Sequence, residues 1–399
     1  MTHPRHPPKK TSVILLLMTM TLLGVFPLDV VLPSFPALSD YFRTSSSDIA
    51  LSVSVFAIGL ALSVVLIGPL SDLLGRKKLL LGGIAVAVVG ATGCLFSSEY
   101  RWFLGFRVIQ AVGCGSFVLS QALVQDLFAG REQERIRIWM VTGGGIFISI
   151  SPLLGTWLQL HLGWQGSFYI FIAIAAAVFL KACFFLENAP AKTAGPRHNI
   201  IQSYRTVCCD FRFLAYWLIC AIVFACHFSF IVISPLIFME QLQLSAYEFS
   251  LTLLLYGAAY IIGGIIAGLL STRINANTQI IAGLCLIFFS GLVMLCLLNQ
   301  FGVSTLTVLI PMIICTAGTT ITRPAATSKA MNLFPDNAGT SASAGNTLIF
   351  IFGGLISALI NLTANNLEST LAACFLILSV AGLVLNALTR RGNCALIAD

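Results

Sequence analysis

Two charged residues stand inside long apolar stretches of this sequence. Asp29 lies in "FPLDVVLP", near the end of an apolar run that begins at about Val13, and Arg107 lies close to the start of another run at residues 102–125. A charge inside hydrocarbon costs roughly 3 kcal/mol or more, so such residues pair with one another or face a path for ions or substrate. We predict that Asp29 binds and releases a proton and that Arg107 pairs with it, either taking part in the coupling or only holding the proton site in place. The alternative is a fixed structural ion pair.

The amino-acid composition indicates whether the protein is soluble or embedded in a membrane. Hydrophobic residues make up 58% of the 399 residues and charged residues only 9%, with a mean hydropathy of +0.95. Soluble domains carry about a quarter charged residues, so the lipid bilayer must surround this chain. The short alternating segments of a β-barrel are absent, and a helix needs roughly 20 apolar residues to cross the hydrocarbon. We predict an all-α integral membrane protein with twelve transmembrane helices, at residues 13–35, 49–70, 79–97, 102–125, 138–160, 166–186, 213–239, 247–270, 279–298, 303–325, 340–361 and 370–389.

The longest polar segment divides these helices into two sets of six. The predicted domains are an N-terminal tail at 1–12, a six-helix bundle at 13–186, a linker at 187–212, a second six-helix bundle at 213–389 and a C-terminal tail at 390–399. An offset of 200 residues aligns Asp48 with Glu248, and residues 68–71 with residues 268–271. Two parallel repeats of this kind, with a site between them near the middle of the membrane, are typical of transporters.

Lysine and arginine collect in the connections on one side of these predicted helices. That side holds eighteen of them, including Arg323 and Lys329, against two on the other, Arg43 and Arg101. The excess of positive charge marks the cytoplasmic side, so both termini are expected in the cytoplasm. The net charge of +7 then reflects topology, and we expect no nucleic-acid partner.

The stretch "GPLSDLLGRKK", residues 68–78, joins the second and third predicted helices. Its two glycines permit a tight turn and a close approach of the helices, and its charges lie at the cytoplasmic face. Together with an aspartate at the inner end of the fourth helix they predict a latch that stabilises the outward-open state and loosens when a proton or substrate binds. Its members are Gly68, Asp72, Gly75, Arg76, Lys77 and Asp126.

Other residues are expected to shape a cavity inside the membrane. Pro33 and Pro36 should interrupt the end of the first helix, and Pro152 with Gly155 predicts a bend and a close contact in the fifth. His227 would relay protons or contact substrate, with a hydrogen-bonded packing role as the alternative. The candidate residues of the substrate cavity are Phe26, Gln110, His227 and Phe230.

Three of these stretches resemble motifs of the major facilitator superfamily. Residues 68–77 resemble the pattern G-x-L-a-D-r-x-G-r-k, with Leu73 where the family usually has arginine. "RVIQAVGCG" resembles R-x-x-q-G-x-g at Arg107, Gln110 and Gly113, and "ISPLLGT" resembles the antiporter-associated pattern g-P-x-x-G-G at its proline and first glycine.

Longer stretches resemble one branch of that superfamily. "PLDVVLPSFPAL", "ISPLIFMEQLQLSAYEFS" and "NLFPDNAGTSASAGNTLIF" are similar to the bicyclomycin-resistance (Bcr/CflA) group of 12-span drug:proton antiporters, and the resemblance runs from about residue 13 to 390. It implies a two-bundle fold, alternating access and proton-driven export across a bacterial inner membrane.

The expected function is therefore proton-coupled export of small amphiphilic compounds. Such a protein uses the proton motive force and needs no cofactor or metal; its partners are the substrate, protons and the lipid bilayer, and we expect a monomer. Export of an endogenous metabolite such as a siderophore, and proton-coupled symport of a small polar solute, remain alternatives. A membrane enzyme is disfavoured, because the sequence shows no nucleophile–base set, zinc-ligand spacing or phosphate-binding loop. A receptor is disfavoured because it needs no titratable aspartate, and two repeated halves of six spans are not typical of one.

Overall fold

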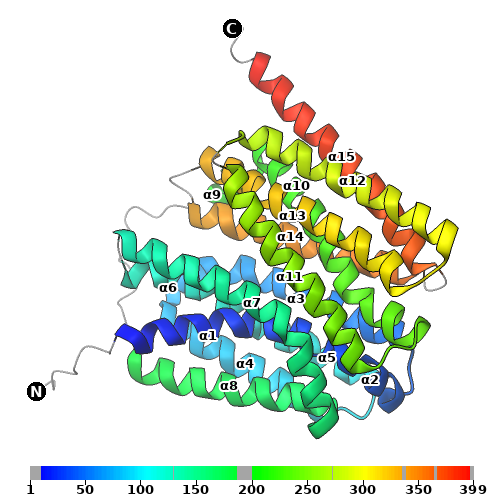
Figure 1. Ribbon diagram of the computed structural model, residues 1–399. Helices are drawn as coiled ribbons and strands as arrows, with labels where there is room; N and C mark the ends of the chain where they lie inside the picture. Colours follow the sequence, from blue (N-terminus) through cyan, green and yellow to red (C-terminus); the bar gives the residue numbers. More distant parts are fainter. Residues whose placement is uncertain are drawn as a thin grey trace, which may run out of the picture.

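The computed structural model describes the backbone of residues 10–128, 130–186, 200–271, 273–334, 338–363 and 366–395, and all regular structure in these ranges is helical (Figure 1). The first half contains α1 Lys10–Asp29, η1 Leu32–Ser34, α2 Phe35–Phe42, α3 Ser46–Leu74, α4 Arg76–Phe96, α5 Tyr100–Cys114, η2 Gly115–Val118, α6 Leu119–Leu127, α7 Gly130–Leu162 and α8 Gln165–Phe185. The second half contains α9 Ile200–Cys208, α10 Phe211–Pro235, η3 Leu236–Gln241, α11 Ala246–Ser271, α12 Ala276–Phe301, α13 Thr305–Leu333, α14 Ala338–Asn361 and α15 Leu367–Ala395.

Ten stretches of the described chain are long and apolar enough to cross a membrane. The two further spans predicted at 102–125 and 138–160 are not among the ten. The first is divided into α5, η2 and α6, and the second lies in α7, a helix of 33 residues whose apolar part, Ile146–Leu162, is short. The multi-pass all-helical fold is thus confirmed, and the number twelve stays a prediction. Most of the predicted linker, residues 187–199, and the predicted tail at 1–9 lie outside the described residues.

The first span ends where the prolines predict. Pro33 has no N–H to donate to the carbonyl of Asp29, four residues earlier, so the helical ladder of α1 cannot continue past Asp29. The chain turns through η1 and resumes as α2, with Pro36 in its first turn. Asp29 is therefore the last residue of α1.

Helices of each half of the chain pack mainly on one another. In the first half α4 packs on α5 and α8, and α1 packs on α7 and α8; in the second half α12 packs on α13 and α15, and α10 packs on α13, α14 and α15. Two long contacts join the halves: α3 packs along α14, and α7 packs along α11 (Figure 1).

Local structure supports the repeat seen at an offset of 200 residues. At the start of α3 the Ser45 hydroxyl accepts from the backbone N–H of Asp48 and the Asp48 carboxylate accepts from the backbone N–H of Ser45. Ser245 and Glu248 form the same reciprocal pair at the start of α11. Each pair is a capping box that satisfies N–H groups left free at a helix start. The helices α3 and α11, each of which forms one of the two long contacts between the halves, therefore begin in the same way.

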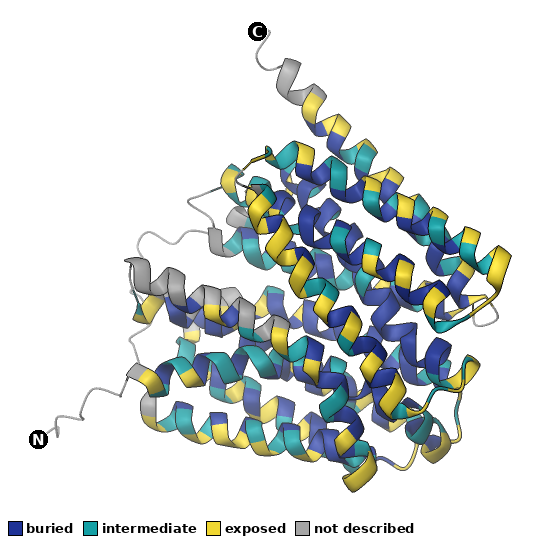
Figure 2. Cartoon of the chain, viewed as in Figure 1, coloured by how far each residue is buried: buried dark blue, intermediate teal, exposed yellow. Residues whose placement is uncertain are grey.

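Burial follows the arrangement expected in lipid. Large apolar side chains such as Leu62, Ile262 and Ile377 are exposed, and buried residues alternate with exposed ones along the helices (Figure 2). In the most apolar part of α10 and η3, 89% of the residues are buried, against 28% in α11. A helix that is apolar all round belongs inside its bundle, so α10 is the central helix of the second half.

Candidate functional site

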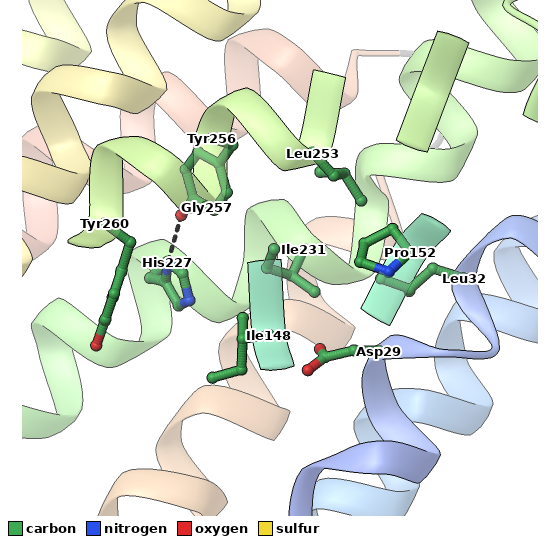
Figure 3. Close-up of a pocket in the computed structure, with 10 residues that line it drawn as sticks. All are labelled: Asp29, Leu32, Ile148, Pro152, His227, Ile231, Leu253, Tyr256, Gly257 and Tyr260. Atoms are coloured by element: carbon green, nitrogen blue, oxygen red, sulfur yellow. Dashed lines mark hydrogen bonds between the residues drawn. The ribbon is translucent and has the colours of Figure 1, made fainter. Parts of the chain in front are cut away.

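A small cavity lies between the two halves of the chain. It is lined from the first half by η1, α7 and the end of α1, and from the second half by α10 and α11 (Figure 3). Its lining residues are Asp29, Leu32, Ile148, Pro152, His227, Ile231, Leu253, Tyr256, Gly257 and Tyr260. Most of these side chains are apolar, and the polar ones are a carboxylate from one half and a histidine and two tyrosines from the other.

Asp29 projects from the end of α1 into this cavity (Figure 3). Within the part of the chain that the structure describes, its carboxylate has no ion pair and no hydrogen bond. The predicted ion pair with Arg107 is therefore wrong for this conformation. Depth in the membrane placed the two residues at one level, but depth does not determine the direction in which a side chain leaves its helix.

The side chain of Arg107 instead binds the backbone at the end of α1. Its side chain is 1% exposed, and its Nη2 donates to the carbonyl oxygen of Pro27 at 3.0 Å. Because α1 ends two residues later, that carbonyl has no helical partner of its own. Nη1 donates to Oε1 of Gln110 at 2.9 Å, and the guanidinium lies 4.4 Å from the ring centre of Phe56. Arg107 thus caps a helix end and positions Asp29 through the backbone.

Two further residues support the same break in the first span. The hydroxyl of Ser167 donates to the carbonyl oxygen of Val30 at 3.3 Å. Gly155 of α7 faces that carbonyl so closely that a Cβ atom would overlap it, and the same atom would lie 3.1 Å from Cδ of Pro33. Gly155 is therefore required for α7 to approach the end of α1.

This close approach makes a stability prediction. We expect Gly155→Ala to lower the apparent melting temperature of the purified protein in detergent, because overpacking a filled site costs about 1–3 kcal/mol. Gly264→Ala in α11 is the matched control, since a Cβ there would meet nothing within 4 Å. Tryptophan fluorescence during heating measures both; equal melting temperatures for the two variants would contradict the packing described for Gly155.

Pro152 removes one hydrogen bond from α7, as its place in the sequence predicts. The carbonyl of Ile148, four residues earlier, accepts instead from the hydroxyl of Ser151 at 3.0 Å. The carbonyl of Pro152 accepts from the hydroxyl of Ser250 at 3.0 Å, and Thr156 bonds to Ser250 at 2.5 Å. The proline thus lies at a polar contact between α7 and α11, and its ring lines the cavity.

His227 both packs and lines the cavity, so the two roles considered for it are compatible. Its Nδ1 is hydrogen-bonded to the hydroxyl of Tyr256, and its ring stacks on Tyr256 and lies 5.3 Å from the ring centre of Tyr260 (Figure 3). The sequence does not predict the two tyrosines as site residues, because nothing in it distinguishes them from other aromatic residues of an apolar helix. Their spacing of four residues places both on one face of α11.

The other candidate cavity residues lie elsewhere. Phe230 is fully buried and packs on Tyr256 at 5.0 Å between ring centres, behind the cavity rather than at its surface. Phe26 and Gln110 line a second small cavity beside Arg107, which is enclosed by residues of the first half alone. Only His227 of the four predicted residues faces the cavity between the halves.

The predicted latch is formed in part. Nε of Arg76 lies 3.2 Å from Oδ2 of Asp126, and Nζ of Lys77 donates to the carbonyl of Cys183 at 2.8 Å. Gly75 has φ +88°, a left-handed conformation that favours glycine, so the turn between α3 and α4 requires it. The backbone of Gly68 and Asp72 continues α3, but the side chain of Asp72 and the surroundings of Gly68 lie outside the described part of the structure.

A multi-pass helical protein with a cavity between two halves, lined from both and holding one carboxylate, has the features of a membrane transporter. The model of the Major Facilitator Superfamily matches residues 15–358. The chain therefore belongs to this family, whose members are transporters rather than enzymes. The resemblance inferred from the motifs is confirmed.

Several similar proteins are drug-resistance proteins by name. A chloramphenicol resistance protein of Pseudomonas aeruginosa is 28% identical over 351 residues, which cover 86% of this chain and 81% of the relative. The multidrug resistance protein MdtL of Klebsiella pneumoniae is 25% identical over 382 residues, covering 93% and 94%. The structure of the human organic anion transporter MFSD10 (TETRAN) matches with a TM-score of 0.67 at 17% identity, covering 96% of this chain and all of that one, and shows that the fold is shared.

Proposed function

We propose that this protein is a proton-coupled exporter of small amphiphilic compounds that works by alternating access. Its twelve spans would form two six-helix bundles in a bacterial inner membrane, with both termini in the cytoplasm and with the proton motive force as the energy source. It would act as a monomer and need no cofactor. The names of the relatives, which refer to chloramphenicol and multidrug resistance, support export of such compounds.

One observation carries the coupling mechanism. The carboxylate of Asp29 faces a cavity that both halves line, and no described residue neutralises it. A motion of one half against the other changes the water and the side chains around Asp29, and with them the relative free energies of its charged and protonated forms. Proton binding at Asp29 and the opening of the cavity are therefore coupled in both directions.

Hydrogen bonds join the halves toward both ends of α3; toward its C-terminal end the hydroxyl of Ser343 donates to the carbonyl of Val64 at 3.1 Å. At its N-terminal end the hydroxyl of Ser46 donates to Glu240, and Ser47 and Asn361 exchange two hydrogen bonds, of 3.2 Å and 2.5 Å. By the charge rule these residues lie at the outer ends of the helices. Opening toward the outside would break these bonds, and the pair of Arg76 and Asp126 at the opposite end would help to stabilise the state that forms.

In the proposed cycle the protein with ionised Asp29 takes up a compound from the cytoplasm or the inner leaflet. It turns outward, Asp29 takes a proton from the acidic outer side, and the compound leaves. The protonated protein returns and releases the proton inside. Because one carboxylate binds the proton, we expect few protons to be exchanged for each molecule of compound.

Transport in proteoliposomes with an acidic interior tests this function. Wild-type protein should take up chloramphenicol or the lipophilic cation tetraphenylphosphonium while protons leave the lumen, and a sugar and an iron-chelating hydroxamate serve as competing candidates. Movement of protons and compound in the same direction would favour the symporter. Exchange of the hydroxamate alone would favour a dedicated siderophore exporter, and exchange of no compound would contradict the proposal.

A further inference from the structure

The second half of the chain holds two cations inside α13, and each lies over an aromatic ring of α10. The guanidinium of Arg323 is 5.3 Å from the ring centre of Phe224, and the ammonium of Lys329 is 5.4 Å from that of Tyr216. The sequence placed both at the cytoplasmic surface, because the span was expected to end near residue 325. The helix continues to Leu333, so Arg323 lies about 15 Å along α13 from its inner end.

Among the described residues of this half, these cations have no acidic counterpart in the middle of a helix. The described carboxylates between residues 211 and 390 stand at or next to helix ends: Glu240, Glu248 and Glu368. Among the described residues, the guanidinium of Arg323 has no ion pair and no hydrogen bond, and the side chain is partly exposed. A charged group at this depth is expected to face water or a partner of opposite charge.

A comparison with the other arginine of the interior makes the difference clear. Arg107 is fully buried, and its two terminal nitrogens donate to Gln110 and to the carbonyl of Pro27. In Arg323, by contrast, the flat face of the guanidinium lies over the ring of Phe224, and its N–H groups donate to no described residue. A guanidinium presents five N–H donors in a planar arrangement that matches a carboxylate, and in Arg323 no described residue accepts from these donors.

Arg323 lies close to the cavity of Asp29 along the second half. Its guanidinium lies over Phe224, and Phe224 is one turn before His227, a lining residue of the cavity, on α10. Phe224 stacks on Phe228 with 5.3 Å between ring centres, which extends the aromatic surface next to the cation. These three residues do not line the cavity itself, but a compound that extended from it along α10 by one turn past His227 would reach the rings and the cation of the second half while still facing Asp29 of the first.

We propose that Arg323 forms an anion-binding subsite and that the protein therefore accepts zwitterionic amphiphiles, aromatic compounds that carry a carboxylate as well as a cationic group. The carboxylate binds the guanidinium of Arg323, the aromatic part lies on Phe224 and Phe228, and the cationic group faces Asp29. This inference rests on the proposed export function and specifies its substrate class. A purely structural Arg323 would instead affect all compounds alike.

Two dyes that differ at one group test the subsite. Rhodamine B is a zwitterion, and its ethyl ester is the corresponding cation without the carboxylate. We measure their uptake, with that of chloramphenicol, into proteoliposomes with an acidic interior. Arg323→Gln should lower the uptake rate of rhodamine B about tenfold or more, because a charge-assisted contact is lost, and change that of the ester less than about twofold. Arg323→Lys should retain part of the zwitterion uptake, and Lys329→Gln is the control cation on the same helix.

Each outcome separates the subsite from the transport function. Equal loss of both dyes in Arg323→Gln, no loss of rhodamine B, or equal effects of Arg323→Gln and Lys329→Gln would overturn the subsite. Wild-type protein that exchanges chloramphenicol for protons but takes up only the ester would also overturn it while leaving the transport function intact. Wild-type protein that exchanges none of the three compounds contradicts the proposed function itself. Ester uptake by Arg323→Gln confirms that the variant is folded.

Discussion

Asp29→Asn is expected to abolish exchange of compound for protons while leaving the protein folded. The amide occupies the same space but cannot bind and release a proton, so transport against a gradient should fall at least about a hundredfold, to the background of empty vesicles. Because the carboxylate has no described partner, the variant loses no ion pair and its melting temperature should not fall. The measurement is proton-driven chloramphenicol uptake in proteoliposomes, with apparent melting temperature as the control.

Passive exchange gives a second readout for this variant. If Asp29→Asn still equilibrates compound across the membrane without a pH gradient, the conformational change is intact and only coupling is lost. Asp29→Glu should retain part of the coupled transport, since it keeps a titrating group in the cavity. Full coupled transport by Asp29→Asn would show that another group carries the proton.

Replacing Arg107 is expected to have the second large effect, but through structure. Arg107→Gln leaves the buried carbonyl of Pro27 without its donor and removes the contact with Phe56. An unsatisfied buried carbonyl costs about 1–3 kcal/mol and a desolvated cation–π contact about 2 kcal/mol, so the melting temperature should fall clearly. Transport should fall with it, because the end of α1 that positions Asp29 is no longer held.

A double-mutant cycle separates this account from an ion pair between the two residues. If Arg107 holds the backbone and not the carboxylate, the effects of Asp29→Asn and Arg107→Gln on stability should add within about 0.5 kcal/mol. If the two side chains pair in the resting protein, Asp29→Asn should rescue part of the loss in Arg107→Gln, because the carboxylate would no longer be left unpaired. Arg107→Lys should recover little, since an ammonium lacks the planar fork that reaches both Pro27 and Gln110.

Several features were predictable because they depend on local chemistry. Proline lacks an N–H, so the break after Asp29 follows from Pro33 alone, and the left-handed turn at Gly75 follows from a glycine between two helices. The contact of Arg76 with Asp126 followed from two charges at one predicted membrane surface. Composition likewise predicted a multi-pass helical protein.

The arrangement inside the membrane depends on how helices are rotated and paired, and a single sequence does not contain that directly. Asp29 and Arg107 were placed at the same depth, yet the arginine turns toward backbone carbonyls that become available only where α1 ends. Tyr256 and Tyr260 became site residues only because α11 packs along α7. Arg323 was assigned to the surface because the apolar run before it ends early, whereas α13 remains helical to Leu333.

Release of a proton on binding tests the central claim most directly. Purified wild-type protein in weakly buffered detergent solution, with a pH-indicator dye, is mixed with a saturating concentration of chloramphenicol, and the protons that appear are counted per protein. If Asp29 exchanges its proton for the compound, the wild type should release up to about one proton at a pH where Asp29 is protonated, and Asp29→Asn should bind the compound and release none. Equal proton release by wild type and Asp29→Asn would show that Asp29 is not the coupling group.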